Sequence, residues 1–138
     1  MSLKAIDINE VRDFILPEDK ENPTIFKIGV IDSRIRSKIR DETATFDDAL
    51  SSTKINQLKI ATTGLEYVRF GLKGFENFLD KNDKPIEFKT ETIKFAGRTY
   101  EVVAESILNM LSDDVIMALG AEIMKGNKLS EKEIKNST

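Results

Sequence analysis

The sequence predicts an α+β fold, a predominantly helical single domain with a small antiparallel sheet or hairpin. Leucines recur every seven residues between positions 58 and 79, and an apolar residue follows three positions after each of the first three. This spacing indicates one long amphipathic helix, or two short ones joined within it. Residues 92–95 and 99–102 are rich in β-branched and aromatic side chains and flank Ala96-Gly97-Arg98, which predicts a hairpin. At 138 residues, 40% of them hydrophobic, the chain has the size of one domain.

Three regions are expected along the chain. They are an N-terminal arm over residues 1–22, a helical α+β core domain over residues 23–126, and a C-terminal short helix or tail over residues 127–138. The arm is charged and carries Pro17, and a short helix is predicted within it over residues 9–16.

The start of the core domain predicts a strand and then a helix. β-branched and aromatic residues indicate a strand that begins near Thr24. Isoleucine then recurs at every fourth position, which indicates a helix over residues 33–40 with Ser33 as its cap. The alternation of cationic and other side chains in the same residues also fits a strand with one cationic face. The polar residues 41–53 predict a loop with one helical turn.

The second half of the core domain begins with a turn. Residues 80–85 have turn composition throughout, and a short extended piece is expected over residues 85–88. After the hairpin, a helix is expected over residues 104–111. A second helix is predicted to begin after Ser112, which caps it, and to end before Gly126.

Composition argues against most enzyme classes. The chain has neither histidine nor cysteine, so it lacks the commonest general base at neutral pH, any thiol nucleophile and the usual ligands of zinc. Its carboxylates show no pair in an apolar setting that would separate two pKa values for acid–base work. We therefore expect a protein that is not an enzyme and that has no cofactor and no metal.

The charge balance and hydropathy narrow the expected partners. The formal net charge is −3, which gives no overall attraction to nucleic acid or to anionic lipid. The cationic run from Arg34 to Arg40 could bind phosphates, but acidic residues flank it. The preferred interpretation is therefore internal ion pairing or a solvated face. A protein partner with an acidic surface is an alternative. No apolar run approaches the roughly 20 residues that cross a bilayer, so a cytoplasmic protein is expected.

One turn resembles a calcium loop in its first residues. Asp80 and Asn82 occupy positions one and three of such a loop, and Glu91 occupies position twelve. Lys84 then replaces an oxygen ligand, and Pro85 replaces the glycine of the sharp bend. An ordinary solvated turn is the preferred interpretation.

Two features suggest surfaces for another protein. Glycines at positions 64, 71 and 74 interrupt the leucine-spaced helix, which indicates either a bend near Gly71 or a second face that meets another helix or subunit. Methionines at positions 110, 117 and 124 either fill the core or form an adaptable apolar surface. The candidate protein-binding residues from these two features are Leu58, Leu65, Tyr67, Val68, Gly71, Leu72, Phe75, Met117 and Met124.

Several stretches resemble the tail assembly chaperone proteins of long-tailed bacteriophages and prophages. Residues 68–78 form the most distinctive stretch, and the similarity spans residues 23–137. The stretches that carry it are residues 23–29 (PTIFKIG), 32–36 (DSRIR), 68–78 (VRFGLKGFENF), 86–88 (IEF), 111–116 (LSDDVI) and 129–137 (LSEKEIKNS).

The resemblance implies a factor of the host cell cytoplasm that coats the tape measure protein and keeps it soluble. Such a factor is displaced as tail tube subunits polymerise, so the tape measure protein and the tail tube protein are the implied partners, with a homo-oligomer left open. Two alternatives stay open as well: a structural tail or connector subunit of the virion, and a small phage-encoded inhibitor of a host defence system.

Overall fold

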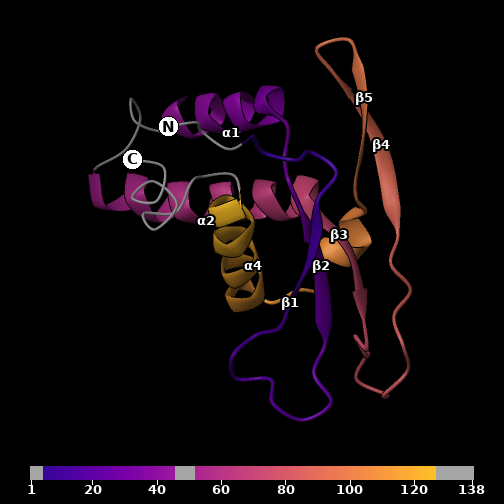
Figure 1. Ribbon diagram of the computed structural model, residues 1–138. Helices are drawn as coiled ribbons and strands as arrows, with labels where there is room; N and C mark the ends of the chain where they lie inside the picture. Colours follow the sequence, from indigo (N-terminus) through magenta and orange to yellow (C-terminus); the bar gives the residue numbers. More distant parts are fainter. Residues whose placement is uncertain (1–4, 46–51, 127–138) are drawn as a thin grey trace, which may run out of the picture.

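The computed structural model describes residues 5–45 and 52–126. In Figure 1, α1 and α2 lie side by side, α4 crosses α2 at a steep angle, and the strands stand at one side of the helices. Along the chain the elements are β1 (Val11–Phe14), β2 (Ile25–Gly29), α1 (Ser33–Thr45), α2 (Ser52–Gly71), β3 (Leu72–Glu76), β4 (Thr90–Phe95), β5 (Arg98–Val103), α3 (Glu105–Leu108) and α4 (Asp113–Gly126).

The described residues form an α+β fold that is not predominantly helical. β1, β2 and β3 make a three-stranded antiparallel sheet in that order, and β4 and β5 make a separate two-stranded sheet. The prediction of a predominantly helical domain with a small sheet or hairpin is therefore wrong. Two segments that the sequence assigned to helices, one in the arm and one after α2, are strands instead.

The helix predicted over residues 58–79 ends at Gly71, where the chain passes directly into β3. Leu72 pairs with Ile28 and Phe75 pairs with Phe26, so the pattern that continued the leucine repeat is that of a strand beside β2. Gly71 faces Ile123 of α4, and a Cβ atom there would lie 2.6 Å from Cγ2 of that side chain. Strand pairing thus overrides the helical periodicity at a residue with low helix propensity.

The N-terminal arm contains an edge strand and not the short helix predicted over residues 9–16. β1 runs antiparallel to β2, with Val11 opposite Gly29 and Phe14 opposite Phe26. Phe14 is half-buried against the core, so the arm packs as part of the sheet.

The segment after β2 is a helix, which resolves the ambiguity between helix and strand. Its cap is Asp32 and not Ser33, because the Asp32 carboxylate accepts a hydrogen bond from the backbone N–H of Ile35 at 2.9 Å. α1 continues to Thr45, so the loop predicted from residue 41 begins later than expected. Residues 46–51 of that loop lie outside the described residues.

The remaining elements of the core agree more closely with those predicted from the sequence. β4 and β5 form the predicted hairpin around Ala96 and Gly97, which have φ angles of 52° and 76°. The helix expected over residues 104–111 is the short α3. Ser112 caps α4, since its hydroxyl accepts from the backbone N–H of Val115 at 3.3 Å. The predicted C-terminal helix or tail lies outside the described residues.

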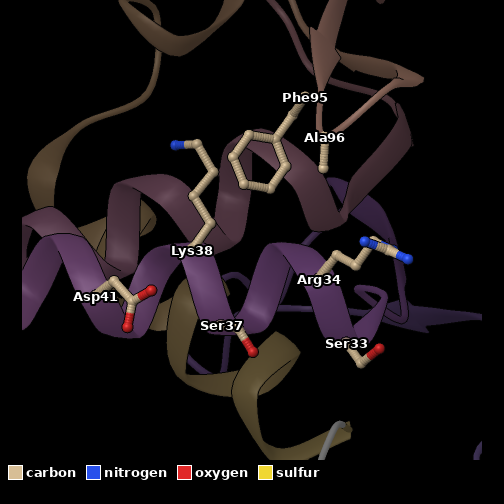
Figure 2. Close-up of a pocket in the computed structure, with 7 residues that line it drawn as sticks. All are labelled: Ser33, Arg34, Ser37, Lys38, Asp41, Phe95 and Ala96. Atoms are coloured by element: carbon tan, nitrogen blue, oxygen red, sulfur yellow. The ribbon is translucent and has the colours of Figure 1, made fainter.

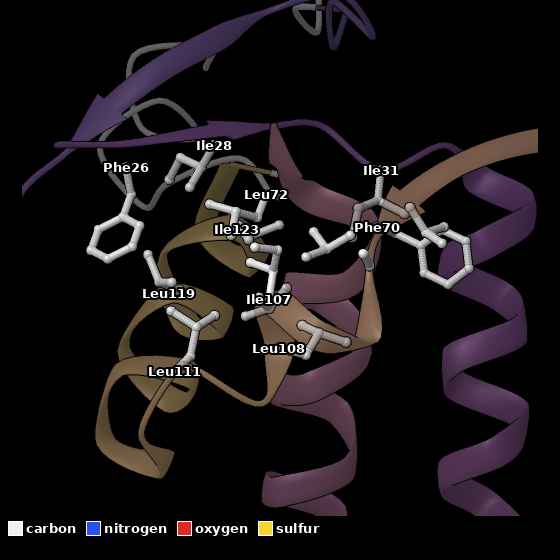
Figure 3. Packing of buried hydrophobic residues seen from close by; sticks show 14 of the residues in the cluster. Phe26, Ile28, Ile31, Phe70, Leu72, Ile107, Leu108, Leu111, Leu119 and Ile123 are labelled. Atoms are coloured by element: carbon white, nitrogen blue, oxygen red, sulfur yellow. The ribbon is translucent and has the colours of Figure 1, made fainter. Parts of the chain in front are cut away.

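The core lies where β2, α2, α3 and α4 meet. Figure 3 shows Phe26 and Ile28 of β2 over Leu119 and Ile123 of α4, with side chains of α3 below them. Within the described ranges, no helix combines the length and apolarity needed to cross a membrane.

Candidate protein-binding surface

α2 and α4 cross with their backbones in contact, because glycines lie at the crossing. A Cβ atom on Gly120 would lie 2.8 Å from the Cα atom of Gly64 and 2.9 Å from its carbonyl oxygen. The small-residue face that the sequence suggested on α2 therefore meets another helix, and that helix belongs to the same chain.

Several of the candidate binding residues are buried within the chain itself. Val68 is fully buried, Leu72 is 3% exposed, and Gly71 is closed over by Ile123. Tyr67 and Met124 are half-buried. The side chain of Leu58 lies outside the described residues.

Phe75 belongs to an aromatic cluster at the end of the three-stranded sheet. Its ring lies edge-on to Phe78 at a centroid distance of 4.9 Å and to Phe88 at 5.2 Å. Phe26 completes the cluster, at 6.5 Å from Phe75. Such contacts stabilise the fold, so the half-buried Phe75 is accounted for by packing within the chain.

Leu65 and Met117 remain open to a partner. Leu65 is 37% exposed and Met117 is 45% exposed, although each belongs to a helix of the core. Leu65 follows Gly64 directly, and the Cα atom of Met117 lies 3.9 Å from the position of a Cβ on Gly64. Both residues therefore belong to the part of each helix that lies beside the crossing, and we call Leu65 and Met117 the crossing surface.

A buried carboxylate lies on α2 next to the crossing surface. The side chain of Glu66 is 14% exposed, with Lys38 at 3.9 Å and Arg69 at 3.8 Å. Burial raises the pKa of Glu66, and these two cations oppose the rise. Its Oε2 has no hydrogen-bond partner in the described structure. The ion pairs are adequate to explain the position of Glu66 without a catalytic role.

A shallow groove of about 340 Å³ lies between α1 and the tip of the hairpin. Figure 2 shows Arg34 and Lys38 on α1 facing Phe95 and Ala96 of the hairpin. Lys38 forms an ion pair with Glu42 and lies 5.7 Å from the centre of the Phe95 ring. The internal pairing expected of the cationic run is thus observed for Lys38.

Sequence reasoning missed a second group of exposed aliphatic side chains, on the N-terminal arm. The relative exposures of Ile6, Ile8, Val11 and Ile15 lie between 43% and 52%. The β-branched residues before Pro17 were the available signal for a strand with an apolar outer face. The charged residues between them made the segment look like a polar arm and not like a strand.

Lys27 forms two ion pairs on the outer face of the three-stranded sheet. Its ammonium donates to the Asp13 carboxylate at 2.6 Å and lies 3.8 Å from that of Glu76. The hydrogen bond to Asp13 raises the pKa of Lys27. The arm strand is thereby tied to β2 by charge as well as by backbone pairing.

The acidic turn at Asp80 is closed by its own backbone. One carboxylate oxygen of Asp80 accepts from the N–H groups of Asn82 at 2.8 Å and Lys84 at 3.0 Å. Residues 5–45 and 52–126 contain no group of three or more carboxylates that could hold a metal ion.

Comparison with protein families, curated protein sequences and solved structures gives no match in any of the three.

Proposed function

We propose that the protein is a phage tail assembly chaperone that binds the tape measure protein in the host cytoplasm and keeps it soluble while the tail tube assembles. It acts by binding and not by catalysis. The observation that carries the proposal is the crossing surface, where Leu65 and Met117 stay exposed beside a tightly closed helix contact.

The crossing surface suits an amphipathic helix as partner. A tape measure protein is a long helical chain, and a helix that presents apolar side chains three or four residues apart can cover both exposed side chains at once. Methionine adapts its shape to different apolar neighbours, which fits a chaperone that must bind many segments of one long helix. Gly64 and Gly120 hold the two helices together, so the surface is present before the partner binds.

The resemblance to tail assembly chaperones supports the same proposal. Its most distinctive stretch, residues 68–78, spans the passage from α2 into β3. That passage brings Leu72 beside Ile28 and fixes the end of α2 next to α4. The shared residues therefore include those that position the helix carrying Leu65.

Co-expression with the tape measure protein tests the proposal. We expect the wild-type chain to yield a soluble complex that co-purifies, and the double variant Leu65→Glu/Met117→Glu to lose it, because two charges would be buried against an apolar helix. Met110→Glu is the matched control, since Met110 is 50% exposed and lies outside the crossing surface. A tape measure protein that stays insoluble with the wild type, or is rescued equally by the double variant, would contradict the proposal.

A structural subunit of the virion is the second candidate. The exposed aliphatic residues of the N-terminal arm favour it, because a subunit that stays in an assembly needs a second apolar contact. Mass spectrometry of purified particles separates the two. A chaperone is absent from the finished particle, whereas a structural subunit is present in many copies.

A further inference from the structure

We propose that the crossing surface binds a basic amphipathic helix, one that carries lysine or arginine about one turn away from its apolar side chains. This inference rests on the proposed function for the location of the site, and it adds the charge of the partner. The observation behind it is a pair of exposed aspartates, Asp113 and Asp114, on the same face of α4 as Met117.

Asp113 and Asp114 border the crossing surface because of the geometry of α4. They precede Met117 by four and three residues, and side chains at these spacings are neighbours on the surface of a helix. The Cα–Cβ bonds of a helix tilt toward its N-terminus, so the Met117 side chain leans over the turn that carries both carboxylates. A helix that covers the exposed Met117 therefore meets the two carboxylates as well.

Neither carboxylate has a partner within the part of the chain that the structure describes. Across residues 5–45 and 52–126, Asp113 and Asp114 form no ion pair and no side-chain hydrogen bond. An aspartate is not needed as the cap of α4, because the hydroxyl of Ser112 accepts from the backbone N–H of Val115. The dipole of α4 favours negative charge in its first turn, so both carboxylates are tolerated there without a cation of their own.

Two cations on the same helices already have anionic partners. Arg69, one turn after Leu65 on α2, lies 3.8 Å from the carboxylate of Glu66. Lys125, at the end of α4, lies 3.1 Å from that of Glu122. The uncompensated charge of the described residues beside the crossing surface is therefore negative, which is the sign of the net charge of the whole chain, −3. Such a border is complementary to a partner with positive charge.

An acidic or an uncharged helix fits this surface less well. Acidic side chains would face two carboxylates of the same sign, which disfavours the complex. An uncharged helix would displace water from the carboxylates without giving them a partner. A basic helix covers Leu65 and Met117 with its apolar face and pairs with both aspartates at the border, so it is the occupant we infer.

Two synthetic helical peptides test the charge of the partner. Both carry leucines three and four residues apart, and their polar positions are lysine in one peptide and glutamate in the other. Fluorescence anisotropy with the full chain should show binding of the lysine peptide and much weaker binding of the glutamate peptide. Raising the salt concentration from about 0.02 M to about 0.5 M should remove most of this difference, because salt screens charges that are exposed to solvent.

Asp113→Asn/Asp114→Asn removes the negative border and leaves the apolar side chains in place. The loss of two exposed ion pairs should weaken binding of the lysine peptide by roughly three- to tenfold at low salt. Glu87→Gln/Glu91→Gln is the matched control, since it changes the net charge equally at two exposed residues. Figure 1 shows β2 and β3 between β4 and α4, so this control should bind the peptide as the wild type does.

Leu65→Ala/Met117→Ala tests whether the carboxylates act together with the crossing surface. This variant removes apolar contact area without adding charge, so it should lose the lysine peptide. Retained binding by this variant would overturn the location of the site. Equal binding of the two peptides by the wild type, or equal weakening by the aspartate variant and its glutamate control, would overturn the charge selectivity.

The peptide result and the co-purification result distinguish this inference from the proposed function. Selective binding of the lysine peptide by a chain that does not co-purify with the tape measure protein would contradict the proposed function and support the basic helix as partner. A chain that co-purifies with the tape measure protein and does not bind the lysine peptide would overturn the inference and leave the proposed function intact.

Discussion

At the scale of single residues, alanine substitutions at the two glycines of the helix crossing, Gly64 and Gly120, should have different effects on stability. A methyl group on Gly120 would meet backbone atoms of Gly64 at 2.8 and 2.9 Å, which cannot move unless α2 and α4 separate. A methyl group on Gly64 would meet its nearest atoms at 3.9 Å, an ordinary contact. We expect Gly120→Ala to lower the free energy of unfolding by about 1–3 kcal/mol through overpacking.

Gly64→Ala is the matched control for that variant. Because alanine favours the helix over glycine by about 1 kcal/mol, Gly64→Ala should leave the free energy of unfolding unchanged or raise it. Urea denaturation of both variants checks the pair. Equal destabilisation by the two substitutions would contradict the packing described for the crossing.

Glu66 predicts how stability depends on pH. Burial raises the pKa of its carboxyl above the ordinary value of 4.5, while Arg69 and Lys38 oppose the rise. The folded chain therefore holds this proton more tightly than the unfolded chain does. The resulting stabilisation is fully present below the unfolded pKa and is lost as pH rises through the raised folded pKa.

Glu66→Gln removes this titration. Relative to the variant, the wild type should lose free energy of unfolding between pH 4.5 and neutrality, as measured by urea denaturation at both ends of that range. Glu76→Gln, at a side chain 62% exposed, controls for the substitution itself. A difference between wild type and Glu66→Gln that does not change with pH would show that the burial of Glu66 has no effect on its titration.

At the scale of elements, the hairpin turn predicts a stabilising substitution. Ala96 and Gly97 both have positive φ angles, the geometry of a two-residue hairpin turn in which Asn-Gly is preferred. Alanine is strained in this conformation, whereas asparagine tolerates it better. Ala96→Asn should therefore raise the free energy of unfolding by about 1 kcal/mol, measured by denaturation, because it relieves part of the strain of a left-handed alanine. Lys94→Asn on the adjoining strand should not.

The same element shows what sequence could and could not predict. Hairpins and capped helices depend on residues close together in the chain, so the turn at Ala96 and the cap at Ser112 were predicted from sequence. β1 and β3 become strands because each pairs with β2, and neither pairing is visible in local spacing. The leucine repeat continued past Gly71 because Leu72 and Phe75, three residues apart, both pair with buried residues of β2 across a shift in register.

The candidate site shows the same limit. Val68 and Leu72 belong to an apolar pattern that predicts burial, but sequence does not say whether the partner is α4 or another chain. Leu65 and Val68 lie in the same pattern, yet Leu65 is 37% exposed and Val68 is fully buried. Periodicity identifies an apolar face, whereas the share of that face left to a partner depends on the tertiary arrangement.

At the scale of the whole molecule, the sheet separates the crossing surface from the exposed aliphatic side chains of the N-terminal arm. Val11 projects from the outer face of the sheet, whereas α4, which carries Met117, packs against the inner face through the contact of Arg12 with Glu122. Effects at distant sites without shared partners usually add. Met117→Glu should thus weaken binding of the tape measure protein, and Val11→Lys should leave it intact.

The double variant Val11→Lys/Met117→Glu closes this comparison. It should bind the tape measure protein as weakly as Met117→Glu alone, when co-purification is measured on matched preparations. If Val11→Lys alone also lost the tape measure protein, the exposed side chains of the arm would belong to the binding surface. The outcome therefore decides whether the partner contacts one face of the molecule or both.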